Sequence, residues 1–436
     1  MKQSGNFNSK IGFILASVGS AVGMGNIWMF PYRLGTYGGA AFLIPYFLFV
    51  ALFGAVGLSG EFALGRLTGT GPIGSYRYAM RSRGQEGGGL LGCIPLFGSL
   101  GIAIGYAVIV GWVLRSLWGA ISGALFEVPS DVYFQQAAGS FGSLPWHILV
   151  VLMTMMILSG GVLKGIEAVN KIMMPAFFLL FLFIALRVAF LDGAAEGYEY
   201  LLMPKWEYLL RIETWVMAMG QAFFSLSITG SGMIIYGSYL EKSEDIPHAS
   251  VMTAVLDTCA AMLAAFAIIP AVFAFDMAPN SGPPLMFVIL PKIFEQMPLG
   301  RLFAVLFFLS VLFAGVTSLV NMFEVCSEAA RKQLKLSRMP SILLVGAAAL
   351  AVGVFIEGEQ ILGRWMDMIT IYVVPFGALL GAVMIYWVLG YPAIRKELNT
   401  GRDTPLGNTF GFVAKYIYVP LAALVLVLGI LWGGIG

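Results

Sequence analysis

The stretch Gly19-Ser20-Ala21-Val22-Gly23-Met24-Gly25-Asn26 decides the fold, because it interrupts an apolar segment in the middle. That segment, residues 11–32, otherwise has the length of a membrane-spanning helix, which needs about 20 apolar residues. Glycine costs about 1 kcal/mol per residue inside a helix, so clustered glycines favour a local break. A second interruption, SLSITGSG at residues 225–232, lies in another apolar segment, residues 213–238.

The composition indicates that lipid is the solvent of this chain. Of its 436 residues, 59% are hydrophobic and 11% are charged, whereas soluble domains carry about 25% charged residues. The net charge of +2 is too small to predict nucleic acid as a partner. Three widely spaced cysteines and two separate histidines form no metal-binding or catalytic pattern. The partners that we expect are therefore the lipid bilayer and a small molecule.

The apolar pattern predicts an all-α membrane protein with 11 transmembrane helices, because backbone groups in lipid must be paired within the span. The predicted spans are residues 11–32, 40–65, 90–122, 146–162, 171–190, 213–238, 249–275, 301–330, 340–356, 365–389 and 413–433. No long polar segment separates them, so residues 1–436 are expected to form a single transmembrane domain.

The basic residues predict the orientation of the spans. With the N-terminus in the cytoplasm, 17 of the 25 Lys and Arg residues fall on the cytoplasmic side, as the positive-inside rule requires. Eleven spans then leave the C-terminus outside. The loops are short and contain no glycosylation sequon, which favours a multi-pass protein of a prokaryotic plasma membrane.

The two interrupted spans are the first and the sixth, which occupy matching places if the first ten spans divide into two fives. This predicts an inverted five-plus-five repeat, with repeat one at about 11–190, repeat two at about 213–389 and an extra helix at about 413–433. Broken helices in corresponding halves are typical of a transporter binding site. Close helix packing through small residues is the alternative, but it does not need the hydroxyl and amide groups found beside these glycines.

Oxygen-bearing side chains occur in other spans. The eighth span contains Thr317 and Ser318, which can ligate a cation or bond back to their own helix. Asp257, in the seventh span, is an ionisable group at membrane depth and therefore a functional candidate. Glu61 is also intramembrane, and we expect it to accept hydrogen bonds from unwound backbone.

Several strings resemble the neurotransmitter:sodium symporter family over residues 7–390. They are Gly19 to Trp28 (GSAVGMGNIW), Phe30-Pro31, Gly38 to Phe42 (GGAAF), Gly60 to Arg66 (GEFALGR), Gly220 to Ser227 (GQAFFSLS) and Ala314 to Ser318 (AGVTS). The resemblance implies a transporter rather than an enzyme, with the fold of the prokaryotic, eleven-span members.

The resemblance also implies two sodium sites and a substrate pocket. The first sodium site would be formed by Ala21, Asn26, Ser225 and Asp257. The second would be formed by Gly19, Val22, Ala314, Thr317 and Ser318. The substrate pocket would be lined by Ala21, Gly23, Gly25, Ile102, Tyr106, Phe224, Ser225, Ser227, Gly230, Ser318 and Met322.

The outer gate departs from the family pattern, which places an arginine where this chain has Met29. The acidic partner remains as Asp367. Arg33 lies one turn after Met29, so we expect it to pair with Asp367 or to extend toward the lipid headgroups. Gly230 stands where the family has a large side chain, which predicts a roomier pocket.

The predicted function is sodium-coupled symport of a neutral, apolar amino acid into the cell by alternating access. Glycine at position 23 leaves room for a substrate carboxylate, and Asp257 supplies a fixed negative charge, so no chloride requirement is expected. The alternatives are a proton-coupled amino-acid carrier and an ion channel. An intramembrane enzyme is disfavoured, because HExxH and GxSxG motifs are absent.

Overall fold

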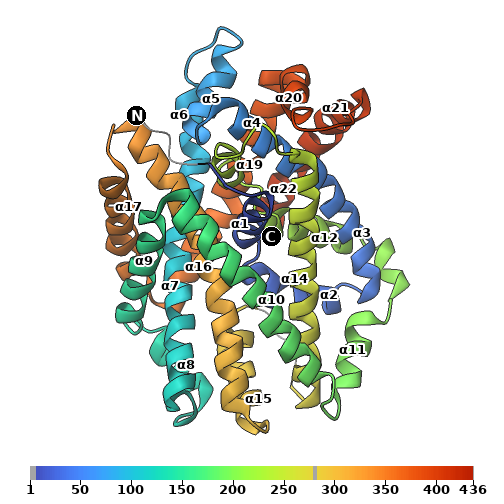
Figure 1. Ribbon diagram of the computed structural model, residues 1–436. Helices are drawn as coiled ribbons and strands as arrows, with labels where there is room; N and C mark the ends of the chain where they lie inside the picture. The colour runs from blue at the N-terminus through green and yellow to red at the C-terminus, as the bar shows by residue number, and fades with distance from the viewer. Residues whose placement is uncertain (1–5, 278–281, 436) are drawn as a thin grey trace.

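The computed structural model describes residues 6–277 and 282–435, whose regular structure is helical throughout (Figure 1). Within these residues, 8 helices are long and apolar enough to cross a membrane, and the count rises to 9 with one bent pair. The eight are Ala40–Thr68, Gly88–Ser122, Val162–Val188, Ile246–Ala274, Gly300–Gln333, Arg338–Ile356, Glu359–Leu398 and Asn408–Trp432. The all-α membrane fold is confirmed, and the predicted number of 11 is compatible with these spans.

Two predicted spans fall short of that criterion for different reasons. The fourth, α9 (Leu144–Ser159), is only 16 residues long. The sixth is divided into α12 (Ile212–Ser225) and α13 (Gly232–Gly237), neither of which could cross a membrane alone. Short apolar length and the glycine break therefore explain the difference between eleven segments and nine.

The helices that make up the spans, and those that connect them, have the following bounds. The spans contain α3 (Ala40–Leu52), α4 (Ser59–Thr68), α6 (Gly88–Leu91), α7 (Cys93–Ser122), α10 (Ala168–Val188), α14 (Ile246–Ala274), α16 (Gly300–Gln333), α17 (Arg338–Gly353), α18 (Glu359–Asp367), α19 (Val374–Val383), α20 (Tyr391–Leu398), α21 (Asn408–Val413) and α22 (Val419–Trp432). π-helical turns at Phe53–Leu58, Val162–Glu167, Met368–Val373, Met384–Gly390 and Ala414–Tyr418 join several of them. The connecting elements are α5 (Pro72–Arg81), α8 (Ser130–Ala137), α11 (Ala194–Leu202), α15 (Leu290–Gln296), the short turns Ala124–Phe126, Trp206–Leu210 and Val354–Ile356, and the π turn Leu285–Ile289.

The first span breaks where the glycines predict. Ser9 caps the start of helix α1 (Lys10–Ala21), because its side chain accepts a hydrogen bond from the amide of Gly12, and Val22 follows the helix in an extended conformation with ψ 120°. Helical structure resumes with the π turn Gly25–Met29 and α2 (Phe30–Thr36), and the two halves differ in direction by 62°. The bend separates the two halves and leaves their facing ends without helical partners.

The second span runs along both halves of the broken sixth span. Helix α3 packs on α12 and α4 packs on α13, while α1 contacts α10, α14 and α16. The breaks are therefore enclosed by unbroken helices. Figure 1 places α8 and α15 at one end of the bundle, and the N-terminus and α5 at the opposite end.

Candidate functional site

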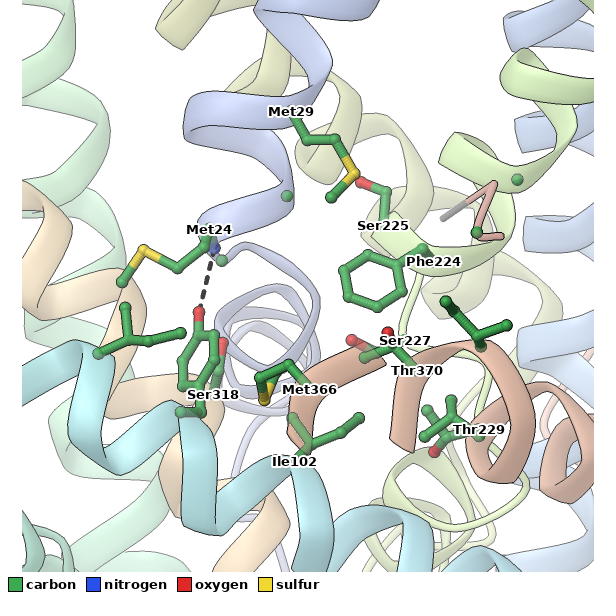
Figure 2. Close-up of a pocket in the computed structure, with 18 of the residues that line it drawn as sticks. Met24, Met29, Ile102, Phe224, Ser225, Ser227, Thr229, Ser318, Met366 and Thr370 are labelled. Carbon is green, nitrogen blue, oxygen red and sulfur yellow. Dashed lines mark hydrogen bonds between the residues drawn. The ribbon is translucent and has the colours of Figure 1, made fainter. Parts of the chain in front are cut away.

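The first break presents backbone groups that two side chains hold in place. Asn26 accepts a hydrogen bond through Oδ1 from the amide of Gly23 at 3.0 Å. The hydroxyl oxygen of Tyr106, on α7, accepts one from the amide of Met24 at 3.0 Å, drawn as a dashed line in Figure 2. The end of α1 is electronegative and the start of the following helix is electropositive, so this break can bind both a cation and an anion.

The second break is held by a buried carboxylate and a tyrosine. Glu61, on α4, accepts a hydrogen bond through Oε1 from the amide of Gly230 at 2.8 Å. This confirms that Glu61 binds unwound backbone. The hydroxyl of Tyr76, on α5, donates to the carbonyl of Gly230 at 3.2 Å. The second span and its following helix therefore fix the conformation of the sixth.

Gly230 serves packing rather than pocket volume in this structure. Its φ of 73° lies in the left-handed region. A Cβ at this position would lie 2.4 Å from the carbonyl oxygen of Gly377, on α19, and 2.7 Å from the hydroxyl of Tyr76. Gly230 does not line the cavity, whereas its neighbour Thr229 does. The expectation that Gly230 itself widens the pocket is therefore corrected, because the space beside it is filled by backbone.

The four residues of the predicted first sodium site include three whose side chains lie in direct contact. Asn26 Nδ2 donates to Asp257 Oδ1 at 2.8 Å and to Ser225 Oγ at 3.1 Å. Ser225 Oγ donates to Asp257 Oδ2 at 2.6 Å. Ala21, the last residue of α1, lines the same cavity as Asn26 and Ser225. The break in each of two spans thus contributes to one cluster with the seventh span.

This cluster is chemically suited to a cation. Asp257 is 0% exposed, and the ion pairs found in residues 6–277 and 282–435 do not include it. A buried carboxylate that has only neutral donors is costly, by several kcal/mol, unless a cation or proton compensates its charge. The Ser225 hydroxyl, the Asp257 carboxylate and the Asn26 side-chain amide are oxygen-bearing groups, the kind of ligand that hard cations prefer. The residues present therefore fit a sodium ion.

The residues of the predicted second sodium site also meet in space. Ser318 Oγ, on α16, donates to the carbonyl oxygens of Gly19 at 3.2 Å and Val22 at 3.0 Å. Thr317 Oγ1 donates to the carbonyl of Ala314 at 3.1 Å. Gly19 faces the side chain of Thr317, since a Cβ on Gly19 would lie 2.9 Å from Thr317 Cβ. These oxygens are neutral and come from α1 and α16, a donor set that fits a second cation.

A cavity of ≈ 530 Å³ extends from the two breaks toward Asp367 and Pro283. All the predicted substrate residues except Gly230 line it. Figure 2 shows the ring of Phe224 on one side of the cavity and Ile102 and Met366 on the other. Polar groups line it at the breaks and again in the tenth span, at Glu359, Asp367 and Thr370. The rest of the lining is largely apolar, which is typical of a site for a small amphiphilic ligand.

Sequence reasoning missed part of the lining. The tenth span contributes Met366, Thr370 and Ile371, and the last span and the residues after it contribute Val425 and Ile435. In sequence these residues look like lipid-facing or core positions. Thr370 gave a weak signal as a hydroxyl in an apolar run, but the apolar residues gave none, because a helix stripe does not reveal whether it faces lipid, protein or a cavity.

Arg33 is buried at 8% exposure and makes different contacts from those expected. Its Nη1 donates to Gln221 Oε1 at 3.2 Å and to the main-chain carbonyl of Ile435 at 2.8 Å. Asp367 lines the cavity, and the described residues form no ion pair between it and Arg33. In this conformation the arginine points into protein rather than to the headgroups, and a pairing with Asp367 stays a prediction.

Comparison with known proteins agrees with this geometry. The chain matches the model of the sodium:neurotransmitter symporter family over residues 4–126 and 130–432. It is 35% identical to an uncharacterized sodium-dependent transporter of Bacillus subtilis, over 97% of this chain and 97% of that protein. It is 32% identical to a similarly named transporter of Methanocaldococcus jannaschii, over 94% and 87% of the two chains.

The structure resembles that of MhsT solved in complex with L-phenylalanine, with a TM-score of 0.86 and 32% identity over 98% of this chain and 99% of that chain. The relatives carry the names of transporters rather than enzymes, as the sequence predicts. Family model, full-length relatives and structural neighbour agree, and the chain therefore belongs to the sodium:neurotransmitter symporter family.

Proposed function

We propose that this chain couples the entry of two sodium ions to the uptake of a neutral, apolar amino acid by alternating access. The observation that carries the proposal is the cluster of Asn26, Ser225 and Asp257, which joins both broken helices to a buried carboxylate beside the cavity. A sodium ion entering the cell gains about 2.3 kcal/mol per 100 mV of membrane potential. Two ions per substrate would support strong accumulation.

The substrate carboxylate would bind at the first break. The Tyr106 hydroxyl oxygen already accepts a hydrogen bond from the amide of Met24, which leaves its own hydrogen free to donate. Gly25, at the electropositive start of the second half of the span, lines the same cavity as Tyr106. A Cβ on Gly23 would lie 2.7 Å from the Tyr106 hydroxyl, so glycine there keeps the carboxylate position open. The substrate is thus an amino acid rather than an amine.

The substrate side chain would occupy the apolar part of the cavity. Ile102, Phe224 and Met322 line it, and the methionines Met29 and Met366 add adaptable surface. Medium and large apolar side chains gain from burial there, at about 25 cal/mol per Å². The structural neighbour MhsT was solved with L-phenylalanine, a ligand of this class. Glycine and alanine would leave much of the cavity unfilled.

The proposed orientation follows the basic residues, with the N-terminus in the cytoplasm of a prokaryotic cell and the end of the bundle that carries α8 and α15 facing outside. The cavity would then extend from the breaks toward the outside, where Asp367 and Pro283 line it. The two halves of five spans would rock against each other around the breaks.

Uptake into proteoliposomes tests the proposal. The purified chain is reconstituted, and a panel of labelled amino acids is offered under an inward sodium gradient at equal pH, with choline replacing sodium in the control. Sodium-driven accumulation of leucine- or phenylalanine-like substrates is the expected result. Uptake driven by a pH gradient without sodium would instead identify a proton-coupled carrier, with Asp257 as the proton-binding group. Sodium current without any substrate would indicate a channel.

A further inference from the structure

The chain turns back into the molecule after its last helix. Helix α22 ends at Trp432, and Gly433 caps it with φ 67°, donating to the carbonyl of Gly429. Gly434 follows with φ 115°, and its amide donates to the same carbonyl at 2.8 Å. Both φ values lie in the region that favours glycine. This pair of residues reverses the chain and directs Ile435 inward.

Ile435 lies in a site shaped to receive it. It is 3% exposed, and its side chain belongs to the hydrophobic core. A Cβ on Gly220, in α12, would lie 1.9 Å from the carbonyl oxygen of Ile435 and 2.8 Å from its Cγ1. The sixth span therefore carries a glycine at the point where the last residues pack. A Cβ on Gly434 would lie 3.5 Å from the side chain of Ile371, in the tenth span.

The carbonyl of Ile435 is a partner of the buried Arg33 guanidinium, at 2.8 Å. Arg33 also donates to Gln221 Oε1 at 3.2 Å, and Gln221 Nε2 donates to the carbonyl of Gly25 at 3.4 Å. A continuous set of hydrogen bonds thus runs from the end of the described chain to the first residue after the break in the first span. Because hydrogen bonds to charged groups are stronger than neutral ones, the carbonyl of Ile435 helps to fix the position of Arg33.

We infer that Gly433–Ile435 forms a strap of the outer gate, in which the carbonyl of Ile435 positions Arg33 and the segment covers the cavity between the sixth and tenth spans. The strap contacts α2, α12 and the π turn Met368–Val373, and the last two of these elements line the cavity. Any separation of the first and sixth spans from the tenth must detach it. The inference rests on the proposed function in that it names the gate of the same site.

The strap lowers the rate at which the cavity opens to the outside. Loss of one hydrogen bond to a charged group corresponds to about a tenfold change in a rate. Deleting residues 434–436 is therefore expected to speed dissociation of bound amino acid about tenfold. Leu431→Ala is the matched control, because this side chain near the end of the same helix is 70% exposed, and it should remain within about threefold of the native rate.

Two readouts separate this idea from a loss of folding and from failure of the proposed function. The first is the dissociation rate of labelled amino acid, measured with the sodium-dependent affinity and the melting temperature of each variant. The second needs no substrate. A Thr370→Cys reporter, in a background with Cys93, Cys259 and Cys326 replaced by serine, is labelled with a membrane-impermeant thiol reagent in the native and truncated chains. Truncation should increase the labelling rate.

Dependence on Arg33 completes the test. If the strap acts through this arginine, truncation in an Arg33→Gln background should add little to either rate, since the partner of the carbonyl is already gone. Equal rates in the native and truncated chains, or independent effects of truncation and Arg33→Gln, would overturn the inference. If the native chain binds no amino acid but truncation still raises the labelling of the Thr370→Cys reporter, the strap stands and the proposed function fails.

Discussion

At the scale of single residues, the charge of Asp257 governs the site. Its carboxylate accepts hydrogen bonds from Asn26 and Ser225, and neither donor carries a charge. Two sodium ions and a zwitterionic substrate would bring a charge of about +2 into a region of low dielectric constant, where each uncompensated charge costs several kcal/mol. A fixed carboxylate reduces that charge, so a mobile anion is not needed.

The first prediction follows from this charge balance. Native uptake should be the same in sodium gluconate and in sodium chloride. Asp257→Asn keeps the shape of the side chain but removes its charge, so uptake in gluconate should fall at least tenfold, and chloride should restore part of it. The measurement is initial uptake rate in proteoliposomes in the two salts. A native protein that is inactive in gluconate would show that Asp257 is not the compensating anion.

The second prediction concerns the close contact between Gly19 and Asn170. A Cβ on Gly19 would lie 2.0 Å from Asn170 Oδ1 and 2.9 Å from Thr317 Cβ. Gly19→Ala should therefore push α1 away from α10 and α16 and weaken sodium binding about tenfold or more, a cost typical of an overpacked core. Asn170→Ala removes the nearest atom and should restore part of the affinity in the double variant. Sodium titrations of amino-acid binding measure both effects, and no recovery in the double variant would contradict the argument.

At the scale of elements, the breaks were predictable but their surroundings were not. Glycine density placed the interruptions correctly, and the amide of Gly230 binds Glu61 as expected. The role of Gly230 was misjudged, because nothing in its own segment shows that Gly377 of α19 lies against it. The sequence did not predict the Gly433–Ile435 strap for the same reason, since contacts between distant helices depend on how the bundle packs. Sequence patterns therefore predict where a helix breaks, but the packing of distant helices determines which groups lie beside the break.

The third prediction separates backbone strain from crowding in the sixth span. Gly69 and Gly230 both have positive φ, 64° and 73°, but a Cβ on Gly69 meets nothing within 4 Å. Gly69→Ala should cost about 1 kcal/mol of stability, the strain of a left-handed residue. Gly230→Ala adds a clash with the Gly377 carbonyl and should cost about 1–3 kcal/mol more. Thermal unfolding and uptake of the two variants, compared side by side, measure the difference. Equal losses would show that the contact with α19 is unimportant.

At the scale of the whole molecule, one buried arginine ties the two predicted repeats together at the end opposite to the gate. Arg66, on α4, donates to Glu397 Oε1 at 2.6 Å and to the carbonyl of Glu397, on α20, also at 2.6 Å. It also reaches the carbonyls of Glu241 at 3.1 Å and Glu244 at 2.6 Å, just after the broken sixth span. The same guanidinium therefore joins the second, sixth and tenth spans.

The last prediction follows from the forked geometry of this contact. Arg66→Ala leaves four main-chain carbonyls without the guanidinium, those of Glu241, Glu244, Glu397 and Thr400, while Lys242 stays 2.8 Å from Glu397 Oε1. The change should lower the free energy of unfolding by about 1–3 kcal/mol. Arg66→Lys keeps the charge but not the fork of donors, so it should recover only part of that loss. The control is Arg402→Ala, whose ion pair with Asp245 is partly exposed and should contribute less than about 1 kcal/mol. Melting temperatures of the detergent-purified variants measure the order. Because Arg66 holds elements that must move relative to each other, its loss should also raise the solvent accessibility of the end of the bundle that carries the N-terminus and α5. Full recovery of stability by Arg66→Lys would mean that charge alone maintains the contact.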